Sequence, residues 1–225
     1  NIVEECEYGI YLTDSSCSVT GNILIYNLTY PLGQLGTTFP SYSGNIIFEN
    51  GRQAIAVDGD ISADGIWTDL AVMGMPYVVL DTVTVEPGNE LTVDPGAVVK
   101  FDYDHEIYHN GYQFTTRLIA QGDLIADGTA AKPIYFTSNR EDIAGDTNGD
   151  GDASEPQGGD WGYIRLDNST SILDHCIIRY GGLRDDNPGA SINWRNYMVW
   201  CYSSAPAMTN CSIQHSNTEY GGTAR

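Results

Sequence analysis

Near its start the chain contains the same seven-residue pattern twice. Residues 21–27 read Gly-Asn-Ile-Leu-Ile-Tyr-Asn, and residues 44–50, 23 positions later, read Gly-Asn-Ile-Ile-Phe-Glu-Asn. A fixed period of about 20–50 residues is typical of repeat proteins in which each unit stacks on the next. The unit here is a short β-branched and aromatic run between Gly and Asn, which favours one β-strand per unit over a helix pair. The sequence therefore predicts stacked strands.

The composition agrees with many short strands and turns. The 225 residues include 25 Gly, 9 Pro and 15 Tyr, and the hydrophobic share of 41% is enough for a substantial core. The formal net charge of −20 argues against a nucleic-acid partner, which needs a basic face. The same charge favours the binding of divalent cations, but a solvated acidic exterior, which is common on secreted proteins, is the preferred explanation.

Several weaker features point outside the cytoplasm. The sequence has no apolar run near the ~18 residues needed to span a bilayer, and it begins at Asn1 without an initiator Met or leader, as a mature product or an excised segment would. Three Asn-x-Ser/Thr sequons, at Asn27, Asn168 and Asn210, are possible glycosylation sites. We therefore expect a secreted or cell-surface protein.

The pattern divides the chain into four sections of one continuous repeat structure. Residues 1–58 read as β-strand repeats, interrupted by an expected loop at 28–43. Residues 59–140 contain strands with Pro-Gly turns, residues 141–160 form an acidic loop, and residues 161–225 resume the strand repeats. The fold class predicted is all-β, with inserted loops.

Further repeats support this division. Residues 83–88 and 91–96 both end in Pro-Gly, eight residues apart, as expected of short strands joined by tight turns. Residues 59–65 are echoed at 122–128, and residues 173–178 align with 208–213. Tyr-Gly-Gly at 180–182 is echoed at 220–222, and the polar stretch 183–197 reads as a further loop.

Several segments resemble a known family. Residues 82–88, 128–138 and 159–162 resemble the right-handed parallel β-helix repeat proteins of bacterial and archaeal cell surfaces, and residues 6–12 and 21–27 are similar to the NosD-type repeats of that pectate-lyase-like superfamily. The resemblance implies a right-handed parallel β-helix, that is, a solenoid. It leaves function open, because the superfamily holds lyases, phage depolymerases, adhesins and purely structural surface proteins.

The sharpest local motif is the stretch Asp-Thr-Asn-Gly-Asp-Gly-Asp at residues 146–152. Oxygen-bearing side chains at alternate positions of a Gly-containing loop can converge on Ca²⁺, which prefers six to eight oxygen ligands. No bidentate Glu stands at the twelfth position, where Gln157 lies, so the motif predicts a helix-free calcium loop with a structural role; a solvated turn is the alternative. The predicted ligands are Asp146, Asn148, Asp150, Asp152, Glu155 and Asp160.

The five cysteines permit two disulfides with one thiol left over. Cys176 and Cys211 occupy matching places in two repeats, so they are expected in neighbouring strands, within reach of a disulfide. Cys6 and Cys17 are close enough in sequence to link the first repeat. Free thiols packed in the core are an equally good interpretation.

Candidates for catalysis are few. A lyase-like site resembles an acidic calcium cluster beside a cationic base, and a hydrolase needs facing carboxylates. The residues available for such roles are Lys100, Lys132, His105, His109 and the adjacent pairs Asp174–His175 and Asp185–Asp186. Adjacent strand residues point to opposite faces, and the His pair lacks a third ligand. Structural roles are therefore favoured throughout, and the sequence argues against an enzyme.

Aromatic residues are the remaining candidates for binding. The four tryptophans, at 67, 161, 194 and 200, together with the tyrosines can form a sugar-stacking stripe, a ladder within the core, or anchors at a protein interface. The sequence does not separate these three roles.

The two ends suggest how the protein functions. A stack of β-strands exposes unpaired backbone groups at both ends unless it is capped, and the repeat pattern starts at Asn1 and is still running near Gly222. We therefore expect a structural extracellular or cell-surface module that self-associates end to end into a filament or sheath, or that is flanked by further repeats in a longer adhesin. The alternatives are a polysaccharide-active lyase or glycoside hydrolase, and a non-catalytic carbohydrate-binding module.

Overall fold

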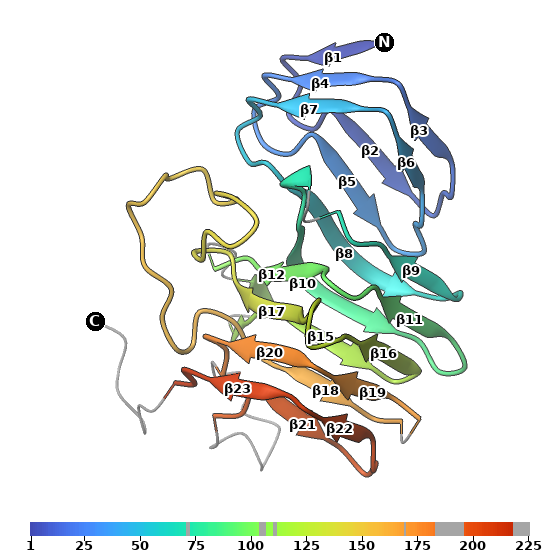
Figure 1. Ribbon diagram of the computed structural model, residues 1–225, viewed down its shortest axis with the longest axis vertical. Coiled ribbons are helices and arrows are strands. Elements are labelled where there is room, and N and C mark those ends of the chain that lie inside the picture. Colours follow the sequence, from blue (N-terminus) through green and yellow to red (C-terminus); the bar gives the residue numbers. More distant parts are fainter. Residues whose placement is uncertain (71–72, 104–106, 110–111, 169, 183–195, 218–225) are drawn as a thin grey trace.

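The computed structural model is all-β, and nearly all of its strand pairs are parallel (Figure 1). It describes residues 1–225 except 71–72, 104–106, 110–111, 169, 183–195 and 218–225; of residues 107–109 and 112–114 it describes the backbone only. No α-helix occurs in the described residues. Strands β13 (Ile107–His109) and β14 (Tyr112–Phe114) form the antiparallel hairpin. The prediction of an all-β fold with mostly parallel strands is confirmed.

Eight strands pair in one continuous series, which we call the main ladder. Its first five strands pair with one another at a spacing of 22 or 23 residues along the chain, as Ile10 does with Leu32 and Tyr77 with Val99, and the later strands follow at longer spacings. We call each such repeat of the chain a rung. The main ladder consists of β2 (Ile10–Thr13), β5 (Leu32–Leu35), β8 (Ile55–Ile61), β10 (Tyr77–Val85), β12 (Val98–Phe101), β17 (Ile134–Ser138), β20 (Cys176–Arg179) and β23 (Ser212–Gln214).

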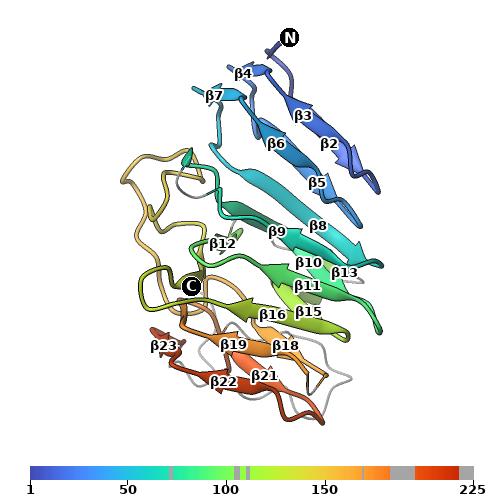
Figure 2. The ribbon, with the colours of Figure 1, turned by 45° about the vertical axis from the view of Figure 1, so that its right-hand side comes forward.

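The other parallel strands lie beside the main ladder in smaller groups, stacked in the same direction from the N-terminal to the C-terminal end (Figures 1 and 2). The side branch, which pairs with the second half of β10, consists of β15 (Arg117–Ala120), β18 (Ile164–Leu166) and β21 (Val199–Cys201). A five-stranded sheet contains β9 (Gly65–Trp67), β11 (Glu90–Val93), β16 (Asp123–Asp127), β19 (Ile172–Asp174) and β22 (Ala207–Thr209). The first rungs add the sheet β1 (Ile2–Glu4), β4 (Ile23–Ile25) and β7 (Ile46–Phe48), and the pair β3 (Ser18–Thr20) and β6 (Ser41–Ser43).

A single column of core side chains runs the whole length of the main ladder. Its members are Ile10, Leu32, Ile55, Tyr77, Val99, Phe136, Ile178 and Ile213, each paired with the next. The six inner members are at most 2% exposed. Because successive strand residues point to opposite faces, this register places one apolar side chain per rung in the core.

The repeated seven-residue pattern forms the strands β4 and β7, which pair in the predicted register. The residue before its last Asn adopts a left-handed backbone in both copies, with φ of 56° at Tyr26 and 52° at Glu49. At the corner that follows, the amide of Asn50 accepts hydrogen bonds from the backbone N–H (3.1 Å) and side-chain Nδ2 (2.8 Å) of Asn27. Asn50 in turn donates to the Leu24 carbonyl at 3.0 Å. The Asn is therefore repeated because it satisfies the backbone of the neighbouring rung at a tight corner.

The prediction of a loop at residues 28–43 is wrong. The segment contains β5 and β6 and completes the second rung. The sequence does not indicate strand β5, because Gly33 and Gln34 are residue types that are common in loops. Gly33 is required there, since a Cβ at this position would lie 2.6 Å from the ring of Tyr11.

Of the sequence echoes, one does not mark equivalent positions, one lies partly outside the described residues, and one is confirmed. Leu91 pairs with both Gly65 and Leu124, so residues 59–65 and 122–128 are offset by four residues. Tyr180 stacks on His215, with ring centroids 5.0 Å apart; residues 220–222 lie outside the described residues. The alignment of 173–178 with 208–213 is confirmed, and the turns at Pro87-Gly88 and Pro95-Gly96 join strands as predicted.

Three long connections leave the main ladder at the same place in successive rungs. Val99 pairs with Phe136, Phe136 with Ile178, and Ile178 with Ile213, which are 37, 42 and 35 residues apart instead of 22. In each case the extra residues lie between the end of a main-ladder strand and the start of a side-branch strand, at 102–116, 139–163 and 180–198. We call this position the insertion corner.

Candidate functional site

The insertion corner is the first candidate site, because loops held by a rigid scaffold are where binding residues concentrate. The second connection, 139–163, folds back along the outer face of the main ladder toward earlier rungs (Figure 1). A Cβ at Gly149 would lie 2.6 Å from the carbonyl oxygen of Gly51. On the covered face, Ala56, Val78 and Lys100 have no exposed surface. The connection is therefore part of the folded structure.

Lys100 anchors this connection. Its side chain is fully buried on β12, and Nζ donates hydrogen bonds to the carbonyls of Glu141 (2.6 Å) and Gly145 (2.8 Å) and to Oγ1 of Thr147 (2.9 Å). Burial lowers the pKa of Lys100 to about 8, against the opposing effect of nearby acidic groups, Asp142 first. All three protons of the ammonium are used, so Lys100 has a structural role and does not serve as a base.

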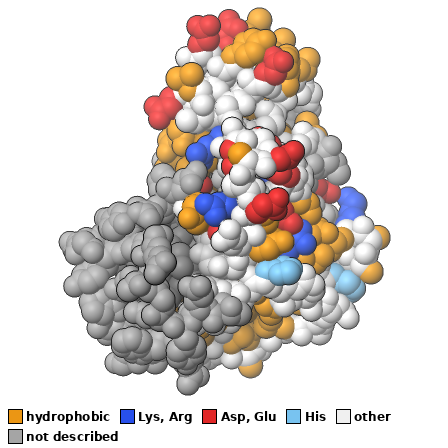
Figure 3. All heavy atoms as spheres, turned by 90° about the vertical axis from the view of Figure 1, so that its left-hand side faces the viewer, with side chains coloured by type: hydrophobic (Ala, Val, Ile, Leu, Met, Phe, Trp, Pro, Cys, Tyr) orange, Lys and Arg blue, Asp and Glu red, His pale blue; other side chains and the backbone are white. Residues whose placement is uncertain are grey.

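A small polar pocket lies where the first and second connections leave the main ladder. Its volume is about 70 Å³, and it is lined by Asp102, Tyr103, Asn139, Arg140, Asn148, Asp150 and Ser154. Figure 3 shows acidic and basic side chains side by side on this face of the molecule. A pocket of this size holds a few water molecules or one small ionic group and is too small for a sugar ring.

Buried charges in this region are paired. Asp102, whose side chain is 2% exposed, forms an ion pair with Arg52 at 3.2 Å and accepts a hydrogen bond from Asn139 at 3.2 Å. Arg140 lies over the ring of Tyr103, 3.3 Å from its centroid, and forms an ion pair with the buried Asp160 at 3.4 Å. These contacts fix the ends of both connections to the rungs beneath them.

The predicted calcium ligands are not brought together. The Asp146 carboxylate accepts hydrogen bonds from the backbone N–H groups of Gly149 and Gly151, both at 2.8 Å, which is an ordinary Asp/Gly turn. Within the described parts of the chain, no three His, Cys, Asp or Glu side chains are placed to hold a metal ion. Calcium binding here stays a prediction that the present geometry does not support.

The remaining predicted ligands have other partners or are exposed to solvent. Asp160 accepts hydrogen bonds from Ser138 Oγ (2.6 Å) and the Gln157 N–H (3.0 Å), and burial raises its pKa. Asn148 donates to Ser154 at 3.0 Å. Asp150, Asp152 and Glu155 are exposed.

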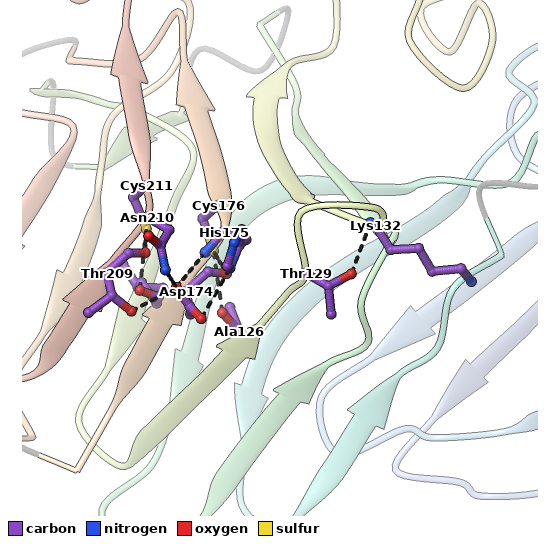
Figure 4. A network of polar contacts seen from close by, with 10 residues as sticks. Ala126, Thr129, Lys132, Asp174, His175, Cys176, Thr209, Asn210 and Cys211 are labelled. Carbon is purple, nitrogen blue, oxygen red and sulfur yellow. Dashed lines mark hydrogen bonds and ion pairs between the residues drawn. The ribbon is translucent and has the colours of Figure 1, made fainter.

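Asp174 and His175 form a contact that strand alternation does not predict (Figure 4). His175 has a left-handed backbone, φ 47°, which turns its ring back so that Nδ1 lies 3.1 Å from Asp174 Oδ2. Asp174 also accepts hydrogen bonds from Thr209 Oγ1 (2.7 Å) and Asn210 Nδ2 (2.9 Å) in the next rung. These hydrogen bonds, with a smaller contribution from His175, lower the pKa of Asp174 to about 2. The expectation that the pair points to opposite faces is wrong.

This network is structural. The neighbouring Cys176 is buried, burial raises the pKa of its thiol, and its Sγ lies 3.4 Å from the Ala126 carbonyl, to which it donates. Cys211 bonds in the same way to the carbonyl of Leu173, at 3.3 Å. The two cysteines lie in neighbouring rungs as predicted. All five cysteines are free thiols in this structure, but only Cys176 is buried and Cys211 half-buried. Cys6, Cys17 and Cys201 are exposed, so the interpretation as a thiol packed in the core holds for Cys176 and not for Cys6 and Cys17.

In the described part of the chain, the structure does not bring the remaining catalytic candidates and glycosylation sequons together in one site. Lys132 is a surface residue paired with Asp69 at 3.1 Å. The side chains of His105, His109, Asp185 and Asp186 lie outside the described residues. Of the sequons, Asn27 is 2% exposed and its amide is used between rungs, so glycosylation there would break the fold, whereas Asn168 is partly exposed and Asn210 is exposed.

The aromatic residues separate into two groups. Trp67 and Trp161 belong to the core, at 3% and 0% exposure, and Trp161 stacks on Phe101 with centroids 4.1 Å apart. Trp200 points outward from the side branch, and Trp194 lies outside the described residues. An outward aromatic and arginine cluster therefore surrounds Trp200, and its partners Arg165, Asp167 and Tyr202 were not predicted because they are up to 37 residues apart in the sequence.

Comparison with known proteins places the chain in no group: no family model, no curated protein and no solved structure matches it. In the described residues we find no helix of the length and apolar character that a transmembrane segment requires.

Proposed function

We propose that the chain is a right-handed parallel β-helix serving as a structural module outside the cell or on its surface, and that its two ends stack head to tail on further copies. The observation that supports this most directly is the core column. Its six inner side chains are at most 2% exposed, but Ile213 at one end is 48% exposed and Ile10 at the other is only half-buried. Among the described residues, the hydrophobic core is thus open at both ends.

At both ends of the described stack, the outermost strands also have backbone N–H and C=O groups without a strand partner. Among the described strands, β1, β2 and β3 at one end and β21, β22 and β23 at the other pair on one side only, as β6, β7 and β9 do within the stack. Such edges are templates for strand addition, which supplies main-chain hydrogen bonds while side-chain pockets set the register. The two ends are different surfaces at opposite ends of the stack, so the contact is heterologous, and its repetition along the stack leads to filaments.

The register of the main ladder suggests how two copies join. Continuing the series beyond β23 brings β2 of the next copy alongside it, with Ile10 stacked on Ile213. The core column would then continue through the junction at the usual strand separation of about 4.8 Å. The same surfaces would accept flanking repeats of a longer surface protein.

The test is the association state of the purified chain. We expect fibres or ordered stacks in negative-stain electron micrographs, and sedimentation that becomes slower on dilution. Ile213→Asp should abolish association because it places a charge in the open core, whereas Ile46→Asp, on a lateral sheet face with 54% exposure, should not. Monomers at all concentrations, or filaments that survive Ile213→Asp, would contradict end-to-end stacking.

A further inference from the structure

We infer that the outer face of the side branch carries a binding site for uncharged carbohydrate, centred on Trp200 and Tyr202 and independent of end-to-end stacking. The strand register of the side branch places three residues of this site in one column. Ile119 pairs with Arg165, and Arg165 pairs with Trp200. Leu118, Ile164 and Leu166, the strand neighbours of Ile119 and Arg165, are fully buried, so Ile119 and Arg165 point outward. The partly exposed Trp200 lies on the same face because it pairs with Arg165.

The aromatic rings around Trp200 are contiguous. Its ring centroid lies 5.2 Å from that of Tyr197, 5.9 Å from that of Tyr163 and 5.4 Å from that of Tyr202. Edge contacts of this kind hold each ring in a fixed orientation. Tyr202 is 45% exposed and Trp200 is partly exposed, unlike the core tryptophans. The cluster therefore presents rigid aromatic surface to solvent.

Arg165 and Asp167 place polar groups beside these rings. Arg165 donates to both oxygens of Asp167, from Nε at 2.7 Å and from a terminal nitrogen at 2.8 Å. Its guanidinium also lies 4.8 Å from the centroid of Trp200 and 4.5 Å from that of Tyr202. This fork-to-fork geometry holds the pair flat and leaves unused donor and acceptor positions at its edge.

This combination matches the two sides of a sugar ring. A pyranose has an apolar C–H face, which packs on an aromatic ring, and a rim of hydroxyl groups, which bond to planar donors and acceptors. The Arg165 charge is already balanced by Asp167, and the chain has a net charge of −20, so a polyanion is disfavoured. The ligand class is therefore an uncharged glycan.

The experiment is affinity electrophoresis of the folded chain through gels containing laminarin, hydroxyethylcellulose, xylan or mannan, with polygalacturonate as the anionic comparison. We expect retardation by at least one uncharged polysaccharide and none by polygalacturonate. Tyr202→Ala should weaken the binding about tenfold or more, because an exposed stacking ring is lost while the core is untouched. Trp200→Phe, which keeps an aromatic ring of smaller area, should weaken it less than Tyr202→Ala combined with Trp200→Phe.

Tyr26→Ala is the matched control, since Tyr26 is 53% exposed but follows β4, which lies at the opposite end of the stack from β21 (Figure 1). Circular dichroism and thermal unfolding of each variant show whether it is folded. No retardation by any uncharged polysaccharide, equal binding by Tyr202→Ala and the parent, or equal losses in Tyr202→Ala and Tyr26→Ala would each overturn the inference. Because association is measured separately by Ile213→Asp, failure of one proposal is distinguishable from failure of the other.

Discussion

Ile178 and Ile213 are paired neighbours in the same core column, yet Ile178 is fully buried and Ile213 is 48% exposed. Both are isoleucines, and within the described residues a further rung follows Ile178 but not Ile213. The difference between their exposed fractions therefore shows how much one additional rung buries the side chain beneath it.

We predict that the same substitution has different effects at these two positions. Ile178→Ala should lower the free energy of unfolding by about 2–5 kcal/mol, because it removes buried methyl groups and leaves a cavity. Ile213→Ala in the dilute, unassociated chain should cost less than about 1 kcal/mol. Urea unfolding of both variants is the measurement, and equal losses would show that the end of the core is already covered.

Removing the buried ammonium of Lys100 should release the connection 139–163. Lys100→Met keeps the length of the side chain but leaves two carbonyls and a hydroxyl without their donor. We expect a loss of about 2–3 kcal/mol and rapid proteolysis within the connection. Lys132→Met is the control, since its side chain is 60% exposed and its ion pair with Asp69 should contribute less than about 1 kcal/mol. Identical proteolysis of both variants would contradict the anchoring role.

The asparagine contacts between rungs should be individually important. Asn50→Ala removes the acceptor for the backbone and side chain of Asn27 and the donor to Leu24. Because buried polar groups are left unpaired, we expect a loss of about 1–3 kcal/mol in urea unfolding. Asn89→Ala, which removes one long hydrogen bond of 3.4 Å to the Glu86 carbonyl, should be nearly neutral. A neutral Asn50→Ala would mean that water replaces these contacts.

Asp174 should make stability depend on pH in the acid range. Its pKa in the folded chain is about 2, below the ordinary value of 3.8, so the folded state binds this proton more weakly than the unfolded state. The stabilisation is therefore complete above pH 3.8 and is lost as the pH falls through about 2. Asp174→Asn should flatten the decline in stability between pH 4 and pH 2, whereas Glu7→Gln, at an exposed position, should leave the slope unchanged. Parallel profiles for wild type and Asp174→Asn would contradict this assignment.

The sequence predicts this fold well where each strand has a local signature. The Gly-Asn pattern and the Pro-Gly turns are local, and the strands they predict are present. β5 was missed because Gly33 is suited to its strand only through the ring of Tyr11, a contact between rungs. The Asp174–His175 contact was missed because it depends on a left-handed residue that the sequence alone does not reveal. Likewise, Arg165 and Trp200 are separated by a long connection, so their spacing in the sequence differs from the repeat of about 22 residues and does not indicate that they pair.

The insertion corner also determines how such a chain can change. A segment that leaves a rung after a main-ladder strand and returns at the side branch can gain or lose residues without shifting the register of any other rung. Length differences of 15 or 20 residues are already absorbed there within one molecule. Natural variants should therefore diverge chiefly in these three segments, and a foreign peptide inserted into one of them would be displayed on an unchanged framework. The register of the rungs must therefore be kept for the chain to fold, whereas the length and sequence of the three connections at the insertion corner can change.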